Sequence, residues 1–276
     1  MGKCEKNRDR ILSLLCQRGR LSIGDVVSEL NASEATVRRY FTAMERSGEL
    51  IRTYGGVCLP SSTNATEYHF KRQSISRIVE KKAIGLEAAK LICSHDRLFF
   101  DSGTTVRECG NFLANIIGQG IVGDISIATN SLVYSDDLAK CCRFSLLGGT
   151  VRLQRMDLCG LATLESLARF NFTKALLGAD GISQDGQLYT MDEDTSLLAA
   201  AVLRQSRQAL ILADSSKLGN VSFAAYGTLK GPSFTLVTDE GVDQKLLDNF
   251  RKNGVNIVIA GAAAPLKKNS NKTTKG

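Results

Sequence analysis

The sequence predicts an α/β protein in two parts, a small helical unit with a β-hairpin followed by a larger region with a largely parallel sheet. Three helical patterns precede the pair Gly55-Gly56, which lies between β-forming residues. From residue 97 to residue 260, short apolar runs alternate with helical ones, as in a parallel sheet covered by helices on both faces. The charge divides in the same way, since residues 1–82 carry a net charge of +6 and residues 83–266 carry −3. A basic N-terminal part is typical of a protein that binds a polyanion.

The N-terminal helices follow from apolar spacing and from capping residues. Apolar residues at helical spacing predict a first helix over about 8–17, ending before Gly19. Ser22 is expected to cap a second helix, whose residues Val26, Val27 and Leu30 share one face. A third helix is expected from Ser33, although Asn31 and Glu34 have the spacing of a capping box and offer an earlier start.

The third helix has two chemically different faces. At 100° per residue, its apolar side chains fall within one narrow sector and its polar and cationic side chains fall opposite. The apolar set is Val37, Tyr40, Phe41 and Met44, and the polar set is Thr36, Arg38, Arg39, Thr42 and Arg46. After Gly48, the run "ELIRTYGGVCL" predicts a short hairpin. Three helices, with a tight turn before the third, and then a hairpin are typical of a winged helix-turn-helix.

The domain boundaries follow from composition. We expect a winged helix-turn-helix over residues 1–59 and a linker over 60–77, which opens with the polar run "PSSTNA". An α/β domain is expected over 78–264, and it begins with an amphipathic helix at about 78–92. The basic run at 265–276 is expected to be a disordered tail.

Several predicted strands of the larger region end in small polar loops, where ligands of open α/β sheets bind. The loop "DSGTT", from Asp101 to Thr105, lies between a strand and a helix near 105–114. Its N–H groups and its hydroxyls suit a phosphate at a helix N-terminus, although Ser and Thr also serve as ordinary helix caps. Further loops contribute Asp180 in "GADG", and Asp214 and Lys217 in "ADSSK". Acids, an amine and a phosphate cradle in one cleft would bind a phosphorylated sugar or would catalyse its isomerisation, and strand-end Asp and Gly residues can also simply shape turns.

Composition argues against several other classes of protein. No apolar run is long enough to span a membrane, and the first residues lack the apolar stretch of a signal peptide, so we expect a cytoplasmic protein without a membrane partner. The eight cysteines form no CxxC pair, and the two histidines, His69 and His95, fit no ligand pattern. We therefore expect no metal and no cofactor, and we expect the cysteines to act as small buried hydrophobes. Neither GxGxxG nor a Walker pattern is present, so a dinucleotide or ATP is not the expected ligand.

The order of motifs resembles that of the DeoR family of bacterial transcriptional regulators, from about Arg8 to about Asp239. The N-terminal motifs are "RILSLL", "TVRR" and "SGELIRTYGGV", and the later ones are "EKKAIGLEAAKLI", "FFDSGTT", "ATNS", "LLGGTVR", "LGADGIS" and "LADSSKLG". The resemblance implies a winged helix-turn-helix followed by a sensor domain related in fold to ribose-5-phosphate isomerases, which binds sugar phosphates without converting them. It also implies a repressor of sugar catabolism that binds a double-stranded DNA operator as a homodimer or homotetramer, and not an enzyme.

The resemblance also implies residues for each site. The residues implied for DNA binding are Ser33, Thr36, Arg38, Arg39, Tyr40, Thr42, Arg46, Arg52, Tyr54, Gly55 and Gly56. The residues implied for effector binding are Asp101, Ser102, Gly103, Thr104, Thr105, Asn130, Gly149, Asp180 and Lys217. The chain departs from the family at Tyr40, where an acidic residue usually follows the arginine pair, and at the apolar run "TSLLAAAVL", where the family usually has a polar helix.

Two other functions remain open at this stage. One is a sugar-phosphate isomerase with an added N-terminal module, although no acid-base pair stands out beyond Asp180, Asp214 and Lys217. The other is a metabolite sensor that binds a partner protein through its N-terminal helices.

Overall fold

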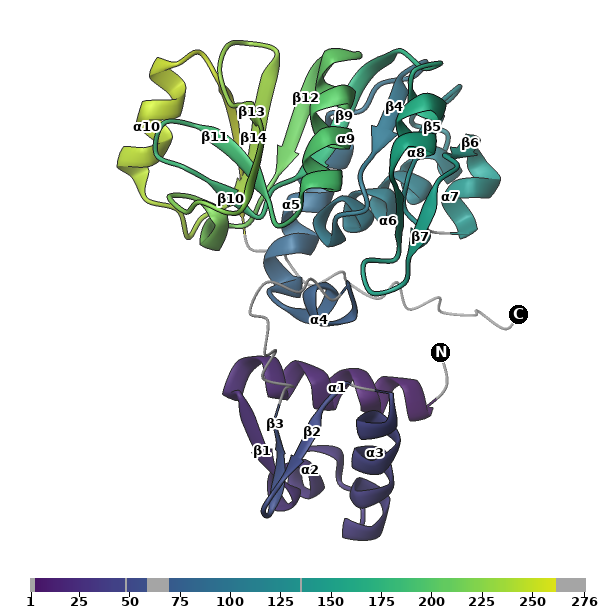
Figure 1. Cartoon of the computed structure of the whole chain (residues 1–276), viewed down its shortest axis with the longest axis vertical. Coiled ribbons are helices and arrows are strands. Elements are labelled where there is room, and N and C mark those ends of the chain that lie inside the picture. The colour runs from purple at the N-terminus through teal and green to yellow at the C-terminus, as the bar shows by residue number, and fades with distance from the viewer. Residues whose placement is uncertain (1–2, 48, 59–69, 135, 262–276) are drawn as a thin grey trace, which may run out of the picture.

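The computed structural model describes residues 3–47, 49–58, 70–134 and 136–261. They form a small N-terminal unit and a larger α/β region, with the short helix α4 (Phe70–Ile75) between them (Figure 1). The predicted fold class is confirmed. Residues 60–69 of the expected linker and the expected tail at 265–276 lie outside the described residues.

The N-terminal unit has the predicted three helices and hairpin. The elements are α1 (Lys3–Arg18), β1 (Arg20–Ser22), α2 (Ile23–Leu30), α3 (Glu34–Arg46), β2 (Ile51–Thr53) and β3 (Gly56–Cys58). Ser22 caps α2 in a capping box with Asp25, and the Ser33 side chain accepts the Thr36 N–H at the start of α3. Asn31 does not start α3, because it ends α2 in a left-handed conformation.

Strand β1 is an element that the sequence did not reveal. It pairs antiparallel with β3, so the hairpin becomes a three-stranded sheet in the order β1-β3-β2. This pairing brings Gly56 against Leu21 so closely that a Cβ at position 56 would lie 2.1 Å from the Leu21 carbonyl oxygen. Gly56 is therefore buried and serves strand packing, whereas its neighbour Gly55 is exposed at the turn.

We expect Gly56→Ala to destabilise the N-terminal unit by about 3 kcal/mol, the upper end of what overpacking costs, because backbone atoms would have to separate. Gly55→Ala is the matched control, with φ +80° but open space around the new methyl group, and it should cost only about 1 kcal/mol. Chemical denaturation of both full-length variants, followed by circular dichroism, measures the difference. Equal loss in the two variants would contradict the assigned packing role of Gly56.

The larger region is built on a sheet of seven strands, counted among the described residues, in the order β15-β14-β12-β9-β4-β5-β6. Every neighbouring pair in this sheet is parallel, as the alternating pattern predicts. The strands are β4 (Arg97–Phe100), β5 (Ser126–Thr129), β6 (Arg143–Leu146), β9 (Phe172–Gly178), β12 (Ser206–Leu212), β14 (Phe234–Asp239) and β15 (Asn256–Ala260).

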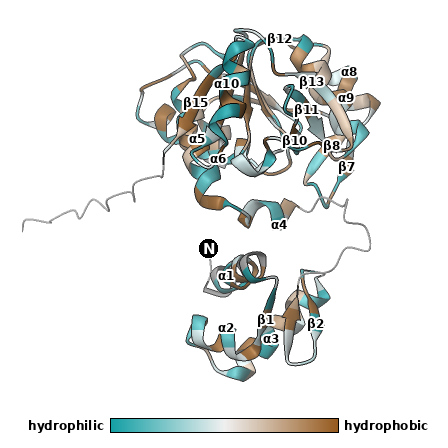
Figure 2. Cartoon of the chain, turned by 90° about the vertical axis from the view of Figure 1, so that its left-hand side faces the viewer, coloured by the Kyte–Doolittle hydropathy of each residue, from teal (hydrophilic) through white to brown (hydrophobic). Residues whose placement is uncertain are grey.

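Helices cover both faces of the sheet. They are α5 (Ile78–Lys90), α6 (Thr104–Gly118), α7 (Asp136–Cys141), α8 (Leu161–Leu167), α9 (Glu193–Arg204) and α10 (Gln244–Lys252). Alternate residues of a strand join different cores, since Leu98 packs with α5 and α6 whereas Phe99 packs with α9 and α10. Figure 2 shows β15 as largely hydrophobic and the outward side of α10 as hydrophilic.

Smaller antiparallel pairs complete the region and were not predicted. Strands β10 (Gly181–Ile182), β11 (Gln187–Thr190) and β13 (Ala224–Thr228) form one sheet, and β7 (Thr150–Arg152) pairs with β8 (Asp157–Cys159). Helix α8 was also missed. The expectation that the cysteines are buried is confirmed for Cys109 and Cys159 but is wrong for Cys93 and Cys141, which lie exposed near the ends of α5 and α7.

Candidate functional sites

The first candidate site is the exposed face of α3. Val37, Phe41 and Met44 are completely buried in the core of the N-terminal unit, so the opposite side of the helix faces outward. Arg39 and Arg46 are exposed there, and neither forms an ion pair or a hydrogen bond with another described residue. Their guanidinium groups are consequently available to an external anion.

Five other residues of the predicted DNA-binding set form contacts within the N-terminal unit. Arg38 forms an ion pair with Glu34 one turn earlier, with 2.6 Å between Nη2 and Oε1. Thr42 accepts a hydrogen bond from Arg52 of β2 at 3.3 Å, which ties the hairpin to α3. Ser33 and Thr36 share the cap at the start of the helix, with 2.9 Å between their hydroxyl oxygens.

The hairpin tip contacts β1 and the start of α2, where the Ile23 N–H donates to the Gly55 carbonyl at 3.4 Å. Tyr54 is fully exposed, and the Arg20 guanidinium donates a hydrogen bond to the Tyr54 carbonyl at 3.1 Å, which holds the tip. Gly55 is exposed at the turn, whereas Gly56 is buried against β1 and does not reach the exposed surface.

Tyr40 lies on the other side of α3 from the arginines. Its ring is half-buried against the N-terminal core, and its hydroxyl accepts a hydrogen bond from Asn7 of α1 at 3.1 Å. The structure thus places Tyr40 in the contact between α1 and α3, as expected from its position on the predicted apolar stripe, and the DNA contact implied by the resemblance stays a prediction.

The second candidate site is a pocket at the carboxyl ends of β4, β9 and β12, which we call the strand-end pocket. It has a volume of about 560 Å³, including the space at its open mouth. Predicted residues that line it are Asp101, Ser102, Gly103, Thr104, Thr105, Asp180, Asp214 and Lys217. Residues that the sequence did not reveal are Gln73, Lys81, Arg155, Thr190 and Thr195.

The N-terminus of α6 opens into this pocket. Gly103 occupies the cap position, and no side chain among the described residues caps the first N–H groups of the helix. The hydroxyls of Ser102, Thr104 and Thr105 lie around this end. Such an end combines N–H donors with the positive end of the helix dipole, which favours an anion.

Asp101 holds the two sides of the pocket together. Its carboxylate accepts hydrogen bonds from the Ser102 N–H at 2.8 Å and from the Gly178 N–H at 3.1 Å, which joins the end of β4 to the end of β9. Burial raises the pKa of Asp101 to about 6. Asp180, which accepts the Met191 N–H at 3.0 Å, also has a pKa raised by burial.

Lys81 is the buried cation of the pocket, with 4% of its surface exposed. Its Nζ donates a hydrogen bond to the Gln73 carbonyl oxygen at 2.5 Å. Burial lowers the pKa of Lys81 to about 8, against an opposing effect of Asp214. The signal in the sequence was a lysine on the same helical face as Ile84, Gly85 and Ala88, which are all buried. Burial of a cation at a core position of a helix costs free energy unless a ligand or a protein partner compensates its charge.

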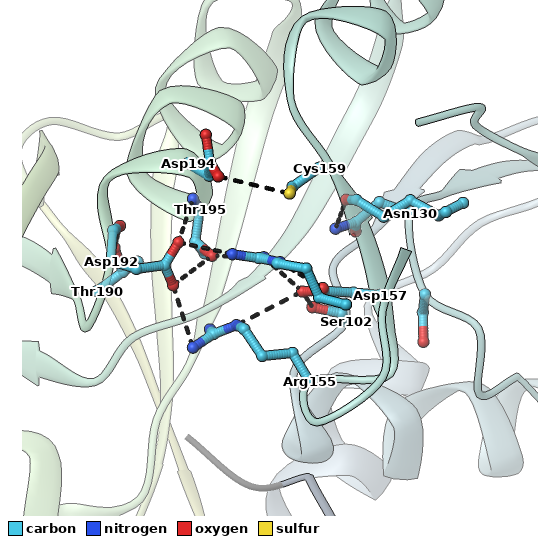
Figure 3. Close-up of polar contacts among 12 residues, drawn as sticks. Ser102, Asn130, Arg155, Asp157, Cys159, Thr190, Asp192, Asp194 and Thr195 are labelled. Carbon is cyan, nitrogen blue, oxygen red and sulfur yellow. Dashed lines mark hydrogen bonds and ion pairs between the residues drawn. The ribbon is translucent and has the colours of Figure 1, made fainter. Parts of the chain in front are cut away.

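Arg155 enters the pocket from the turn between β7 and β8. Its Nη1 lies 3.1 Å from Asp192, and Figure 3 shows the two side chains pointing toward one another. Arg152 makes a two-pronged contact with Asp157, both bonds being 2.8 Å, and reaches Asp192 at 2.7 Å. Because Ser102 also donates to Asp157 at 3.1 Å, this ion cluster connects the pocket to the start of α9.

Two residues implied by the resemblance do not line the pocket. Asn130 is buried and donates to the Leu158 carbonyl at 3.2 Å, so it supports β8 (Figure 3). Gly149 has φ +151°, and a Cβ there would lie 1.9 Å from the Thr163 hydroxyl oxygen, so it allows β7 and α8 to approach closely.

In residues 3–47, 49–58, 70–134 and 136–261, no group of His, Cys, Asp and Glu has the arrangement of a metal site. None of the helices in these same ranges is long and apolar enough to cross a membrane.

Family models match both parts of the chain. Residues 8–63 match the family model of the DeoR-like helix-turn-helix domain, and residues 76–240 match that of the DeoR C terminal sensor domain. The HTH-type transcriptional repressor GlcR of Bacillus subtilis is 32% identical over 252 residues, which cover 90% of this chain and 93% of that relative. The glycerol-3-phosphate regulon repressor of Escherichia coli is 28% identical over 227 residues, covering 82% and 88% of the two chains.

One of the similar solved structures is an isomerase. Ribose 5-phosphate isomerase from Plasmodium falciparum has a TM-score of 0.38 and 18% identity, covering 50% of this chain and 52% of the isomerase.

Proposed function

The chain belongs to the DeoR family of transcriptional regulators, and we propose that it represses an operon for the use of a sugar or sugar derivative, with its operator affinity set by a phosphorylated sugar. One observation carries the proposal. A single chain combines an outward face of α3, with Arg39 and Arg46 open to an anion, and a pocket in which the N-terminus of α6 meets the buried cation Lys81.

The α3 face supports binding in the DNA major groove. An α-helix fits this groove, and an exposed arginine such as Arg39 can pair with the two acceptors of guanine. Arg46 and Arg52 lie near the end of the helix and on the hairpin, where they would hold the phosphate backbone. Assembly as a homodimer or homotetramer would set two such helices on half-sites one or more helical turns apart.

The strand-end pocket supports binding of a phosphorylated sugar. The α6 N-terminus and Lys81 would hold the phosphate, and the carboxylates of Asp180 and Asp214 would accept hydrogen bonds from sugar hydroxyls. Lys217, half-buried at the rim, adds a second cation. Such a ligand changes operator affinity only by binding the DNA-competent and the DNA-incompetent states unequally.

Genome-wide mapping of the DNA bound by the full-length protein tests the proposal and would name the neighbouring genes. The DNA fragments that the protein binds would then be titrated with the protein and followed by fluorescence anisotropy. Each titration would be made with and without glucose 6-phosphate, fructose 6-phosphate, fructose 1-phosphate and glycerol 3-phosphate. We expect one phosphorylated compound, and not its unphosphorylated parent, to change the affinity about 5-fold to 150-fold. Absence of any preferred DNA, or turnover of a sugar phosphate by the protein, would overturn the proposal in favour of a partner-binding sensor or an isomerase.

The pKa of Lys81 predicts a pH dependence of effector binding. The ammonium form attracts the phosphate, and in the free protein this form is lost as the pH rises through about 8. Affinity for the phosphorylated effector should therefore fall above pH 8, by at most about tenfold per pH unit. Asp101, with its pKa raised to about 6, is already ionised in this range and does not contribute to the change of affinity with pH. Isothermal titration calorimetry between pH 7.5 and 9.5 measures the effect. Lys81→Met should bind the effector weakly over this whole range, and its affinity should not fall above pH 8.

A further inference from the structure

Helix α4 is attached at its start to the β7–β8 turn and near its end to Lys81 of the strand-end pocket. At the start, the Phe70 N–H donates to the Gln154 carbonyl at 2.9 Å, and Gln154 is the neighbour of Arg155 in the β7–β8 turn. The Phe70 ring is buried, with the Arg107 guanidinium of α6 6.0 Å from its centre. Near the end, the Gln73 carbonyl oxygen accepts the hydrogen bond from Lys81. A helix of only six residues has little stability of its own, so these contacts hold it.

The junction after α4 is fixed separately. Arg77 has a left-handed backbone with φ +52°, and its guanidinium lies 3.3 Å from Asp214 and 3.6 Å from Asp239 at the ends of β12 and β14. It also donates to the Ser215 hydroxyl at 3.0 Å. The start of α5 is therefore anchored to the sheet, and a change at Lys81 would reach α4 through the Gln73 carbonyl without requiring α5 to move.

On its other side, α4 contacts the N-terminal unit. Ile75 packs against the core that also contains Val37, Phe41 and Met44 of α3, and Figure 1 shows α4 next to α1. One short helix thus contacts both the pocket that would bind the effector and the hydrophobic core that orients the arginines of α3.

We propose that α4 is the coupling element of the repressor, and that a phosphate in the strand-end pocket competes with the Gln73 carbonyl for Lys81 Nζ. This inference rests on the function proposed above. A phosphate oxygen is a charged acceptor and makes a stronger hydrogen bond with an ammonium group than a neutral carbonyl does. The flexible stem of lysine lets the ammonium turn toward the anion. Once Lys81 turns, α4 loses both a hydrogen bond and the cation at its C-terminal end, and its contact with the N-terminal unit loosens.

Hydrogen–deuterium exchange of the full-length protein, with and without saturating inorganic phosphate, tests the competition. We expect slower exchange in residues 101–105, which reports binding, and about tenfold faster exchange in residues 70–75, as the loss of one charge-assisted hydrogen bond implies. Slower exchange at 101–105 with unchanged or slower exchange at 70–75 would overturn the coupling and leave the proposed site standing. No change in either segment would overturn the coupling and the phosphate site together.

Substitutions separate the role of Lys81 from general damage. In Lys81→Met, residues 70–75 should exchange without phosphate as fast as in the phosphate-bound natural chain, while the central strands β9 and β12 keep their protection. Lys82→Met is the matched control, because Lys82 is the adjacent lysine and is exposed, and it should behave like the natural chain. Slow exchange of α4 in Lys81→Met would overturn the proposal.

A second pair of variants tests transmission to DNA. Ile75→Ala should keep phosphate protection of residues 101–105, but its operator affinity should be close to that of the phosphate-bound natural chain both with and without phosphate. Val79→Ala, an exposed position four residues later, should keep the effect of phosphate on operator affinity. A full response in Ile75→Ala would show that the signal does not pass through α4.

Discussion

Arg39→Ala is expected to weaken operator binding by about 1–3 kcal/mol, roughly 5-fold to 150-fold, because the side chain projects from the exposed face of α3 and has no partner among the described residues that would retain it. Fluorescence anisotropy with an operator fragment measures the loss. Arg207→Ala on β12 is the control for the change in net charge, since Arg207 is exposed on the larger region, and it should leave binding within about twofold.

The salt dependence of the same variant tells which part of the DNA Arg39 contacts. If it pairs with a base, the loss in Arg39→Ala should be greatest for the preferred operator, and the slope of log affinity against log salt should stay nearly the same. If it holds a phosphate, the loss should be uniform across sequences and the slope should fall by about 1. Operator binding that is unaffected by Arg39→Ala would remove α3 from the DNA interface.

Asp157→Ala is expected to lower the free energy of unfolding of the larger region by about 3–5 kcal/mol. Asp157 is fully buried and accepts two hydrogen bonds from Arg152 and one from Ser102. Its removal leaves the largely buried Arg152 with one fewer counter-ion and leaves the Ser102 hydroxyl without this acceptor. Urea denaturation followed by circular dichroism measures the change.

Two controls define the cause of that loss. Asp124→Ala removes a carboxylate that is largely exposed, and it should change stability by less than about 0.5 kcal/mol. Asp157→Asn keeps the volume and one acceptor oxygen, so it should cost less than the alanine variant. A cost for Asp157→Ala no larger than that for Asp124→Ala would mean that the ion cluster contributes no net stability.

The main sheet could be predicted because its strands are buried on both faces. Runs such as "RLFF" and "ALIL" are apolar at successive positions, and helices lie between several of these runs, which leaves few alternatives to parallel pairing. The helices of the N-terminal unit were equally clear, since Ser22 and Ser33 cap them and the apolar stripe of α3 has helical spacing.

The short antiparallel elements could not be predicted in the same way. Strand β1 has three residues and pairs with β3 more than 30 residues later, so no local pattern marks it. Strands β7 and β8 are equally short, and their contact depends on charged residues, Arg152 and Asp157, that do not resemble a core. Helix α4 lies within the expected linker at 60–77, and it depends on contacts with both neighbouring parts of the chain.

The residues of the candidate sites also divide into those that the sequence could predict and those that it could not. Asp101 to Thr105, Asp180, Asp214 and Lys217 were found because strand-end loops converge at one edge of a parallel sheet. Lys81 and Arg155 were missed because they come from a helix and a turn that the topology brings over this edge. Gly56, Gly149 and Asn130 were implied by the resemblance, and the structure places them where packing and strand support account for them.

The order of folding follows from the strand pairing. The pairs of the N-terminal sheet all lie within residues 20–58, whereas the large sheet is complete only when β15 ends at Ala260. At roughly 5–20 residues per second, synthesis of the intervening 200 residues takes about 10–40 s, and domains fold as they emerge. Under the proposed function, a chain terminated early would present the arginines of α3 without the strand-end pocket, so its DNA binding would not respond to a phosphorylated sugar. Premature termination is therefore expected to leave a DNA-binding fragment that does not respond to the effector, in place of a simple loss of function.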